Sequence, residues 1–147
     1  MRMKLKTYGH GNKLDISKFE QAININSIVP KGGLWASPID SEFGWKEWCE
    51  NEGFSDLGSV FEFEFEGNIL IINSFDDTKK LPYITTPEGL LYPDFEATIK
   101  QGYDAIWLTF EGLIEDIAQA KFEDPNFHEW GCECVLILSA HGFITNT

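Results

Sequence analysis

Phenylalanine and glutamate alternate along residues 60–66, which read Val-Phe-Glu-Phe-Glu-Phe-Glu. Alternation with a period of two predicts a β-strand, because successive side chains of a strand point to opposite faces of the sheet. We expect Phe61, Phe63 and Phe65 to face a core and the three glutamates to face water. This is the clearest secondary-structure pattern in the chain.

Shorter apolar runs predict the remaining strands. They lie at residues 4–8, Leu34–Ser37, Ile69–Asn73, Asp104–Phe110 and Glu133–Ser139. Pro38 would stop the second of these, since proline cannot donate to the hydrogen-bonded ladder, and Asn68 would form the turn that leads into the third. The last run contains the apolar stretch Val135–Leu138, which is typical of a central strand.

Apolar residues at helical spacing predict four short helices. The first begins at Asp15 and carries Ile16, Phe19, Ala22 and Ile23. The second runs from Asp40-Ser41 to about Glu50, with Trp45, Trp48 and Cys49 on one face. The other two cover Asp94–Gln101, ended by Gly102, and Leu113–Lys121. Several strands with a few short helices favour an α+β fold with mixed or antiparallel sheets over a doubly wound sheet. Without repeats or linkers, residues 1–147 are expected to form one domain.

The net charge of the chain limits the classes of partner that we expect it to bind. The chain has 24 acidic and 11 basic residues, a net charge of -13, and no cluster of Lys or Arg. These charges would repel a phosphate backbone, so we do not expect nucleic acid as a partner. Such acidity is common on ordinary surfaces, but it also suits docking on a basic partner protein. Met1-Arg2-Met3-Lys4 is followed by no long apolar run, so we expect a cytoplasmic protein with no membrane partner.

Two cysteines lie close together near the end of the chain. Cys132 and Cys134 are two residues apart in the last predicted strand, a spacing that fits reduced thiols better than a disulfide. Together with His128 they match no established zinc-binding pattern, and no fourth ligand is evident. No metal site is therefore expected.

Three short segments could carry chemistry. Gly9-His10-Gly11 places a histidine between glycines after the first strand, and Gly32-Gly33-Leu34-Trp35-Ala36-Ser37 combines flexible backbone with an indole and a hydroxyl. Glu133 opens an otherwise apolar strand, where a carboxylate needs exposure or a partner. Taken singly, each also has an ordinary structural explanation as a turn residue, a core tryptophan or a strand end.

The order of these segments resembles the ADP-ribosyltransferase superfamily. The resemblance is to its His-Tyr-Glu branch, which includes the poly-ADP-ribose polymerases, and it is carried by His10-Gly11, Gly33–Ser37 with Ser41, and Glu133–Leu136. These short motifs span nearly the whole chain. The stretch Lys31–Cys49 is also similar to that of small bacterial and phage proteins.

The resemblance implies an ADP-ribosyltransferase-like fold and an NAD site. Gly11 and Ser41 would hold the nicotinamide carboxamide, and Trp35, in the second motif with Gly33 and Ser37, would stack on the nicotinamide ring. His10 would bond the adenosine ribose, and Trp45 would form a second aromatic wall. Glu133 would bond the nicotinamide ribose and stabilise the positive charge that develops as nicotinamide leaves.

The motifs depart from the family pattern at three positions. Asn12 stands where the family has a small hydroxyl residue, Trp35 replaces a tyrosine and so lacks its phenol, and Trp45 is four residues after Ser41, one more than in the family. These departures concern the activity more than the fold.

The resemblance leaves three functions to compare. The first is an NAD-dependent mono-ADP-ribosyltransferase that acts on a protein target, as a toxin or a phage host-control factor. The alternative is a catalytically inactive acidic protein that uses the same fold to bind and inhibit a partner. A transferase that removes a phosphate from RNA with NAD is a third, opposed by the lack of a basic patch.

Overall fold

A six-stranded mixed sheet forms the centre of the protein in a computed structural model, which describes residues 2–8, 13–41, 44 and 60–144. Its strand order is β3-β1-β2-β8-β7-β4, and every neighbouring pair is antiparallel except β4 and β7. The strands are β1 Arg2–Tyr8, β2 Leu34–Pro38, β3 Val60–Glu66, β4 Ile69–Ile72, β7 Ala105–Leu108 and β8 Cys134–Ile137. A separate hairpin pairs β5 Tyr83–Thr85 with β6 Leu91–Pro93. The predicted α+β fold with a mixed sheet is confirmed.

Short helices connect the strands. Among the described residues, the α-helices are α2 Phe95–Lys100 and α3 Phe110–Gln119, and the 3-10 turns are η1 Ile16–Lys18, η2 Asp76–Lys80, η3 Phe127–Trp130 and η4 Ala140–Gly142. Asp94 and Thr109 cap the two α-helices, because their side chains accept hydrogen bonds from the backbone N–H of Ala97 and Gly112. None of the helices in these described parts has the length and apolarity needed to cross a bilayer.

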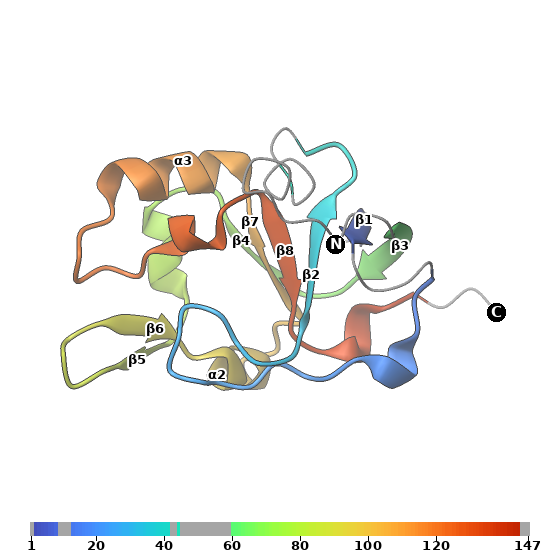
Figure 1. Cartoon of the computed structure of the whole chain (residues 1–147), viewed down its shortest axis with the longest axis horizontal. Helices are drawn as coiled ribbons and strands as arrows, with labels where there is room; N and C mark the ends of the chain where they lie inside the picture. Colours follow the sequence, from blue (N-terminus) through green and yellow to red (C-terminus); the bar gives the residue numbers. More distant parts are fainter. Residues whose placement is uncertain (1, 9–12, 42–43, 45–59, 145–147) are drawn as a thin grey trace.

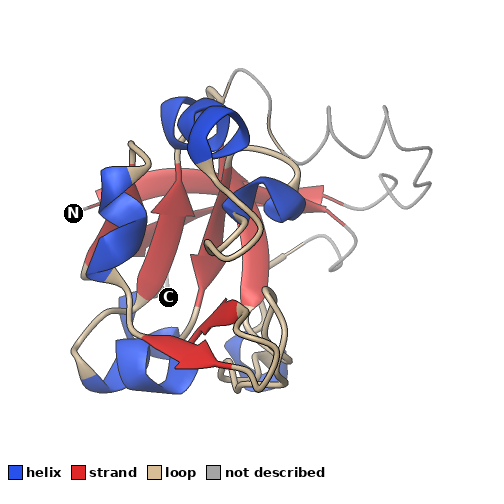
Figure 2. Ribbon diagram, turned by 90° about the vertical axis from the view of Figure 1, so that its left-hand side faces the viewer, coloured by secondary structure: helices blue, strands red, loops and turns tan. Residues whose placement is uncertain are grey.

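The central strands carry apolar side chains on both faces. Helices α2 and α3, η3 and the β5–β6 hairpin lie on one side of β8, and β1 and β3 lie on the other (Figure 1). Figure 2 shows the helices above and below the strands from a second direction. Along β8, Cys134 and Leu136 enter the core on the helical side, whereas Val135 and Ile137 enter the core against the β3 phenylalanines. The four consecutive buried residues of β8 confirm the prediction of a central strand.

Strand β3 follows the alternation read from the sequence. Phe61, Phe63 and Phe65 are buried, and the glutamates between them face outward. The register with β1 brings a basic residue opposite each glutamate, in the pairs Arg2–Glu66, Lys4–Glu64 and Lys6–Glu62. Cross-strand pairs of opposite charge stabilise a sheet, so the acidity of β3 is largely offset by its neighbour.

Several predicted elements have different limits or partners. The helix expected from Asp15 is only the turn η1, after which the chain is extended and Ile23 forms a bridge with Lys31. Asn68 lies between β3 and β4 as expected, but these two strands do not pair, because they lie at opposite edges of the sheet. Strand β7 stops at Leu108, and α3 begins at Phe110. The helix expected from Asp40-Ser41 to Glu50 lies mostly outside the described residues.

Candidate functional site

Glu133 lies directly before β8 and is almost completely buried. Glu133 is only 7% exposed, and its Oε2 accepts a hydrogen bond of 3.0 Å from the indole Nε1 of Trp107. Trp107 stands on the neighbouring strand β7, opposite Val135, so the indole reaches the carboxylate diagonally across two strands. A buried carboxylate that is held by a donor is the arrangement expected of a functional group rather than of a surface charge.

A cleft of about 760 Å³ opens beside this carboxylate. It lies where β1 begins and where β2 and β7 end, at the start of α3. Its lining residues are Arg2, Met3, Lys4, Pro38, Ile39, Asp40, Ser41, Asn73, Trp107, Thr109, Phe110, Glu111 and Glu133. Glu133 and Ser41, both expected at an NAD site, are thus brought together, and the cleft has the size of a small-molecule site.

The floor of the cleft includes polar groups that the sequence did not single out. Thr109 Oγ1 donates to Asn73 Oδ1 at 2.7 Å and also caps α3 by accepting from Gly112 N. Asn73 directly follows β4 and Thr109 directly follows β7, two parallel strands in register. Polar residues that follow parallel strands meet at one edge of a sheet, where ligands commonly bind. Once the parallel pairing of β4 and β7 is known, the position of Asn73 and Thr109 directly after these strands identifies both as candidate site residues.

Ser37 and Trp35 do not reach the cleft. Ser37 is fully buried, and its Oγ donates to the backbone oxygen of Glu133 at 3.0 Å instead of facing a ligand. Trp35 packs on the helical side of the sheet, edge-to-face with Trp130 at 4.9 Å between ring centroids. Because side chains alternate along paired strands, Trp35 shares the face of its partner Leu136, whereas Glu133 shares the face of Val135. The expected stacking of Trp35 on nicotinamide is therefore not supported by this geometry.

Gly33 lies at the other end of β2 from Ser37. It lines a different cavity, of about 410 Å³, whose walls include Phe19, Leu34 and Phe143. Its φ of +75° favours glycine, and a Cβ there would lie 2.9 Å from the backbone oxygen of Ile137. Close packing on β8 explains this glycine, and the structure does not bring it together with Glu133. The remaining expected NAD-site residues, His10, Gly11 and Trp45, lie outside the described residues.

Cys132 and Cys134 are both fully buried on either side of Glu133. Burial, with a smaller contribution from hydrogen bonding to Cys132, raises the pKa of the Cys134 thiol. In the described parts of the chain, no three His, Cys, Asp or Glu side chains gather as a metal site would require. The two cysteines are thus core residues that fix the strand carrying Glu133.

Folded protein is expected to protect this pair from alkylation. The thiolate is the reactive form, and a buried thiol with a raised pKa forms little of it. With iodoacetamide at pH 8, the peptide that contains Cys132 and Cys134 should stay unmodified in native buffer and become doubly modified in denaturant. Peptide mass spectrometry distinguishes the two states. Rapid modification in native buffer would show that β8 is not buried as described.

Comparisons with known proteins identify no relative of this chain. A scan against protein-family models finds no match, and searches of the curated proteins and of the solved structures find none either.

Proposed function

We propose that the protein is an NAD-dependent mono-ADP-ribosyltransferase that modifies a protein. The observation that carries this proposal is the buried Glu133 carboxylate, oriented by Trp107 in the wall of a cleft that Ser41 also lines. The order of the His10-Gly11, Gly33–Ser37 and Glu133 motifs supports the same reaction.

Glu133 has the properties that this reaction requires. Cleavage breaks the bond between the nicotinamide nitrogen and C1′ of the ribose, and the bonding electrons leave with nicotinamide. A nucleophile of the acceptor then bonds to C1′ and loses its proton. The ribose carries positive charge as the first bond breaks, and a fixed carboxylate in a site of low dielectric stabilises that charge more than it stabilises neutral ground-state sugar.

Other residues of the cleft suit the remaining parts of NAD. The Oγ of Ser41 is shielded from solvent and has no hydrogen-bond partner among the described residues, and a buried hydroxyl of this kind favours a partner such as a carboxamide. Arg2 and Lys4 supply positive charge at the cleft of a strongly acidic chain. That placement suits the pyrophosphate, although Arg2 also forms an ion pair with Glu64.

A product assay with the purified chain tests the proposal. The chain is incubated with a protein extract as the source of acceptor and with NAD labelled in the adenine ring, and both free nicotinamide and label bound to protein are measured. We expect nicotinamide above the level of a heat-denatured control, with label on protein. Release of nicotinamide with all label in free ADP-ribose would contradict transfer and leave hydrolysis. No release at any NAD concentration would overturn the proposal.

The alternative, an inactive acidic binding protein, is favoured by one observation on the surface. The net charge is -13, and Asp76, Glu111 and Glu123 expose carboxylates around α3 and η2. Failure to cleave NAD together with salt-sensitive binding to a basic protein would support this function instead.

A further inference from the structure

Helix α3 buries a charged side chain and exposes apolar ones. Asp116 is fully buried, whereas Ile114 and Ile117 are 46% and 60% exposed. A surface helix normally turns its apolar side chains to the core and its charges to water. The exposed isoleucines therefore form an apolar surface on α3 that the core does not cover.

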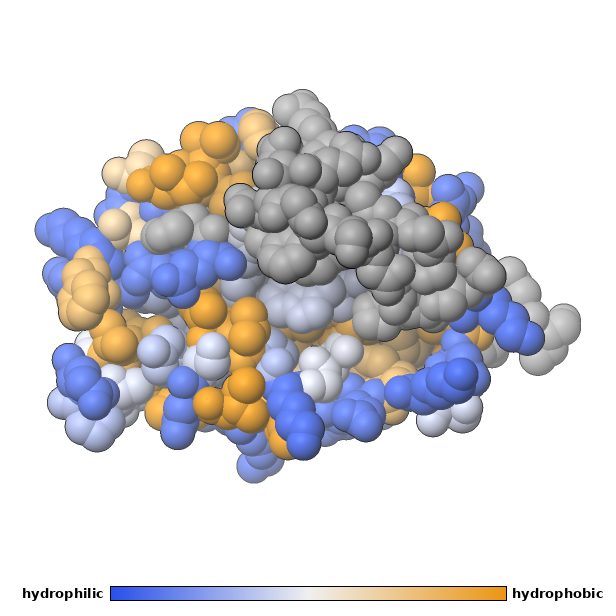
Figure 3. Space-filling view, viewed as in Figure 1, coloured by the Kyte–Doolittle hydropathy of each residue, from blue (hydrophilic) through white to orange (hydrophobic). Residues whose placement is uncertain are grey.

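Half-buried Phe110 and three exposed apolar residues form a row along the helix. Phe110, Ile114, Ile117 and Ala118 follow one another at helical spacing, so they lie on one face. We call these four residues the α3 stripe. Phe122, 78% exposed, follows the end of the helix. Figure 3 shows apolar side chains gathered at the surface over α3.

The stripe begins inside the candidate active site. Phe110, its first residue, lines the same cleft as Glu133 and Trp107. A partner bound along the stripe would therefore extend to the mouth of the cleft. This continuity connects the surface to the site where an acceptor side chain has to enter.

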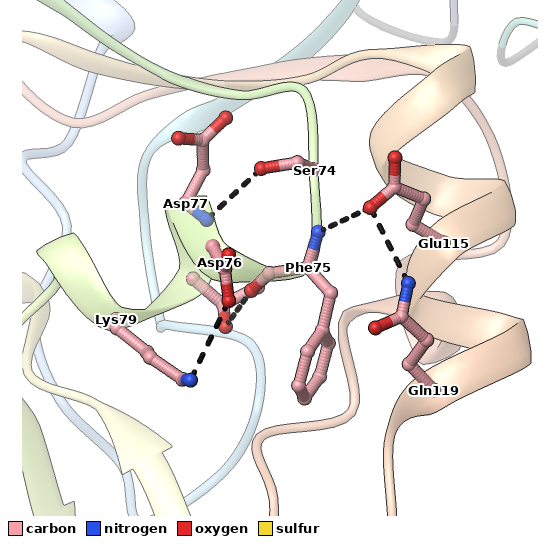
Figure 4. Close-up of polar contacts among 8 residues, drawn as sticks. Ser74, Phe75, Asp76, Asp77, Lys79, Glu115 and Gln119 are labelled. Atoms are coloured by element: carbon pink, nitrogen blue, oxygen red, sulfur yellow. Dashed lines mark hydrogen bonds and ion pairs between the residues drawn. The ribbon is translucent and has the colours of Figure 1, made fainter.

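Contacts on both sides hold α3 in this orientation. At its N-terminus Thr109 caps the helix, and along one flank Glu115 Oε1 accepts from the backbone N of Phe75 at 3.1 Å and from Gln119 Nε2 at 3.4 Å (Figure 4). On the inner side, Leu113 is buried in the hydrophobic core. The outer face is therefore a fixed surface of the folded protein.

Charge decides what kind of partner fits the stripe. The charged residues on and just after α3 that are at least partly exposed are Glu111, Glu115, Lys121, Glu123 and Asp124. Carboxylates outnumber the single lysine, and the whole chain carries -13. A second copy of the chain would bring like charges together, which disfavours self-association. A basic segment with an apolar face would match both the isoleucines and the carboxylates.

We infer that the α3 stripe docks a basic, amphipathic segment of a partner protein and directs the neighbouring residues of that partner into the Glu133 cleft. The docking part stands on the stripe and its charges. The identification of the docked protein as the ADP-ribose acceptor rests on the proposed function.

Binding of a defined peptide tests the docking. The probe is a fluorescein-labelled peptide of leucine and lysine with all leucines on one face of a helix, and the readout is anisotropy at low salt. We expect wild-type protein to bind it, and the double variant Ile114→Ser/Ile117→Ser to bind at least about tenfold more weakly, a difference of about 1.4 kcal/mol. Added salt should weaken the wild-type complex, since its charges are exposed.

Matched controls separate the stripe from general stickiness and from misfolding. Ile23 and Ile25 are 44% and 50% exposed elsewhere on the protein, so Ile23→Ser/Ile25→Ser should bind the peptide as the wild type does. Thermal unfolding by circular dichroism should show that both double variants remain folded. A peptide with glutamate in place of lysine should not bind.

Three results would overturn the inference. They are no binding by wild-type protein, equal binding by wild type and the Ile114→Ser/Ile117→Ser variant, or a wild-type dimer in sedimentation velocity that this variant abolishes. Peptide binding is measured without NAD, so its result does not depend on whether the protein cleaves NAD. Failure of NAD cleavage with stripe-dependent binding would therefore overturn the proposed function alone.

Discussion

Replacing Glu133 with glutamine is expected to lower the rate of nicotinamide release from NAD by about 10²–10³-fold, the range found when one preorganised electrostatic group is removed from an active site. The change keeps the shape of the side chain but removes its negative charge. A neutral amide can still lie beside the indole of Trp107, so the fold should persist. The loss should appear in the turnover rate at saturating NAD, because the charge acts mainly on the transition state.

The control for this variant is Glu129→Gln. Glu129 precedes Glu133 by four residues but is exposed in η3, so its replacement should leave nicotinamide release within about twofold of wild type, as expected for a surface change. If Glu133→Gln retains the wild-type rate while remaining folded, Glu133 does not take part in the chemistry. If both variants lose activity equally, the effect is one of general charge.

Gly112→Ala is expected to destabilise the protein by about 3 kcal/mol or more, the upper range for overfilling a packed site. A Cβ at Gly112 would lie 2.1 Å from the backbone oxygen of Ile72, and backbone cannot move aside as a side chain can. Helix propensity alone predicts the opposite sign, because alanine in a helix is favoured over glycine by about 1 kcal/mol. The sign of the change thus reports directly on the packing of α3 against β4.

Thermal unfolding measures this effect. A loss of about 3 kcal/mol corresponds to a fall in Tm of roughly 6–12 °C for a chain of this size. Ala118→Gly, in the exposed part of the same helix, should cost only about 1 kcal/mol. If Gly112→Ala is as stable as wild type or more stable, α3 does not approach β4 as closely as described.

Patterns within a short segment correctly predicted three elements of the fold. The alternation of Phe and Glu identified β3, the apolar run after Glu133 identified β8, and Asp94 with Gly102 marked the ends of α2. In each case the residues that form the sequence pattern are the same residues that form the strand or helix, so no distant partner had to be known.

Pairing between distant segments could not be read in this way. The apolar residues after Asp15 have helical spacing, yet the chain is extended there because Ala22 N bonds to Leu138 and Gly33 N bonds to Glu20. The placement of β3 and β4 at opposite edges likewise depends on partners far along the sequence.

The residues of the candidate site were likewise predictable only where no pairing between distant strands had to be known. Glu133 and Ser41 were expected at one site and do line one cleft, but the face on which Trp35 lies is decided by its register with β8. Trp107 was missed because an indole in an apolar strand resembles any core residue until its hydrogen bond to Glu133 is seen.

A crystal structure of the Glu133→Gln variant with NAD tests the central claim most directly, since slow cleavage would leave the dinucleotide intact. We expect the nicotinamide ribose beside residue 133 and Trp107, within hydrogen-bonding distance of the introduced amide, and the carboxamide on the side of Ser41. NAD bound instead in the cavity beside Gly33, or no bound NAD at saturating concentration, would contradict the account.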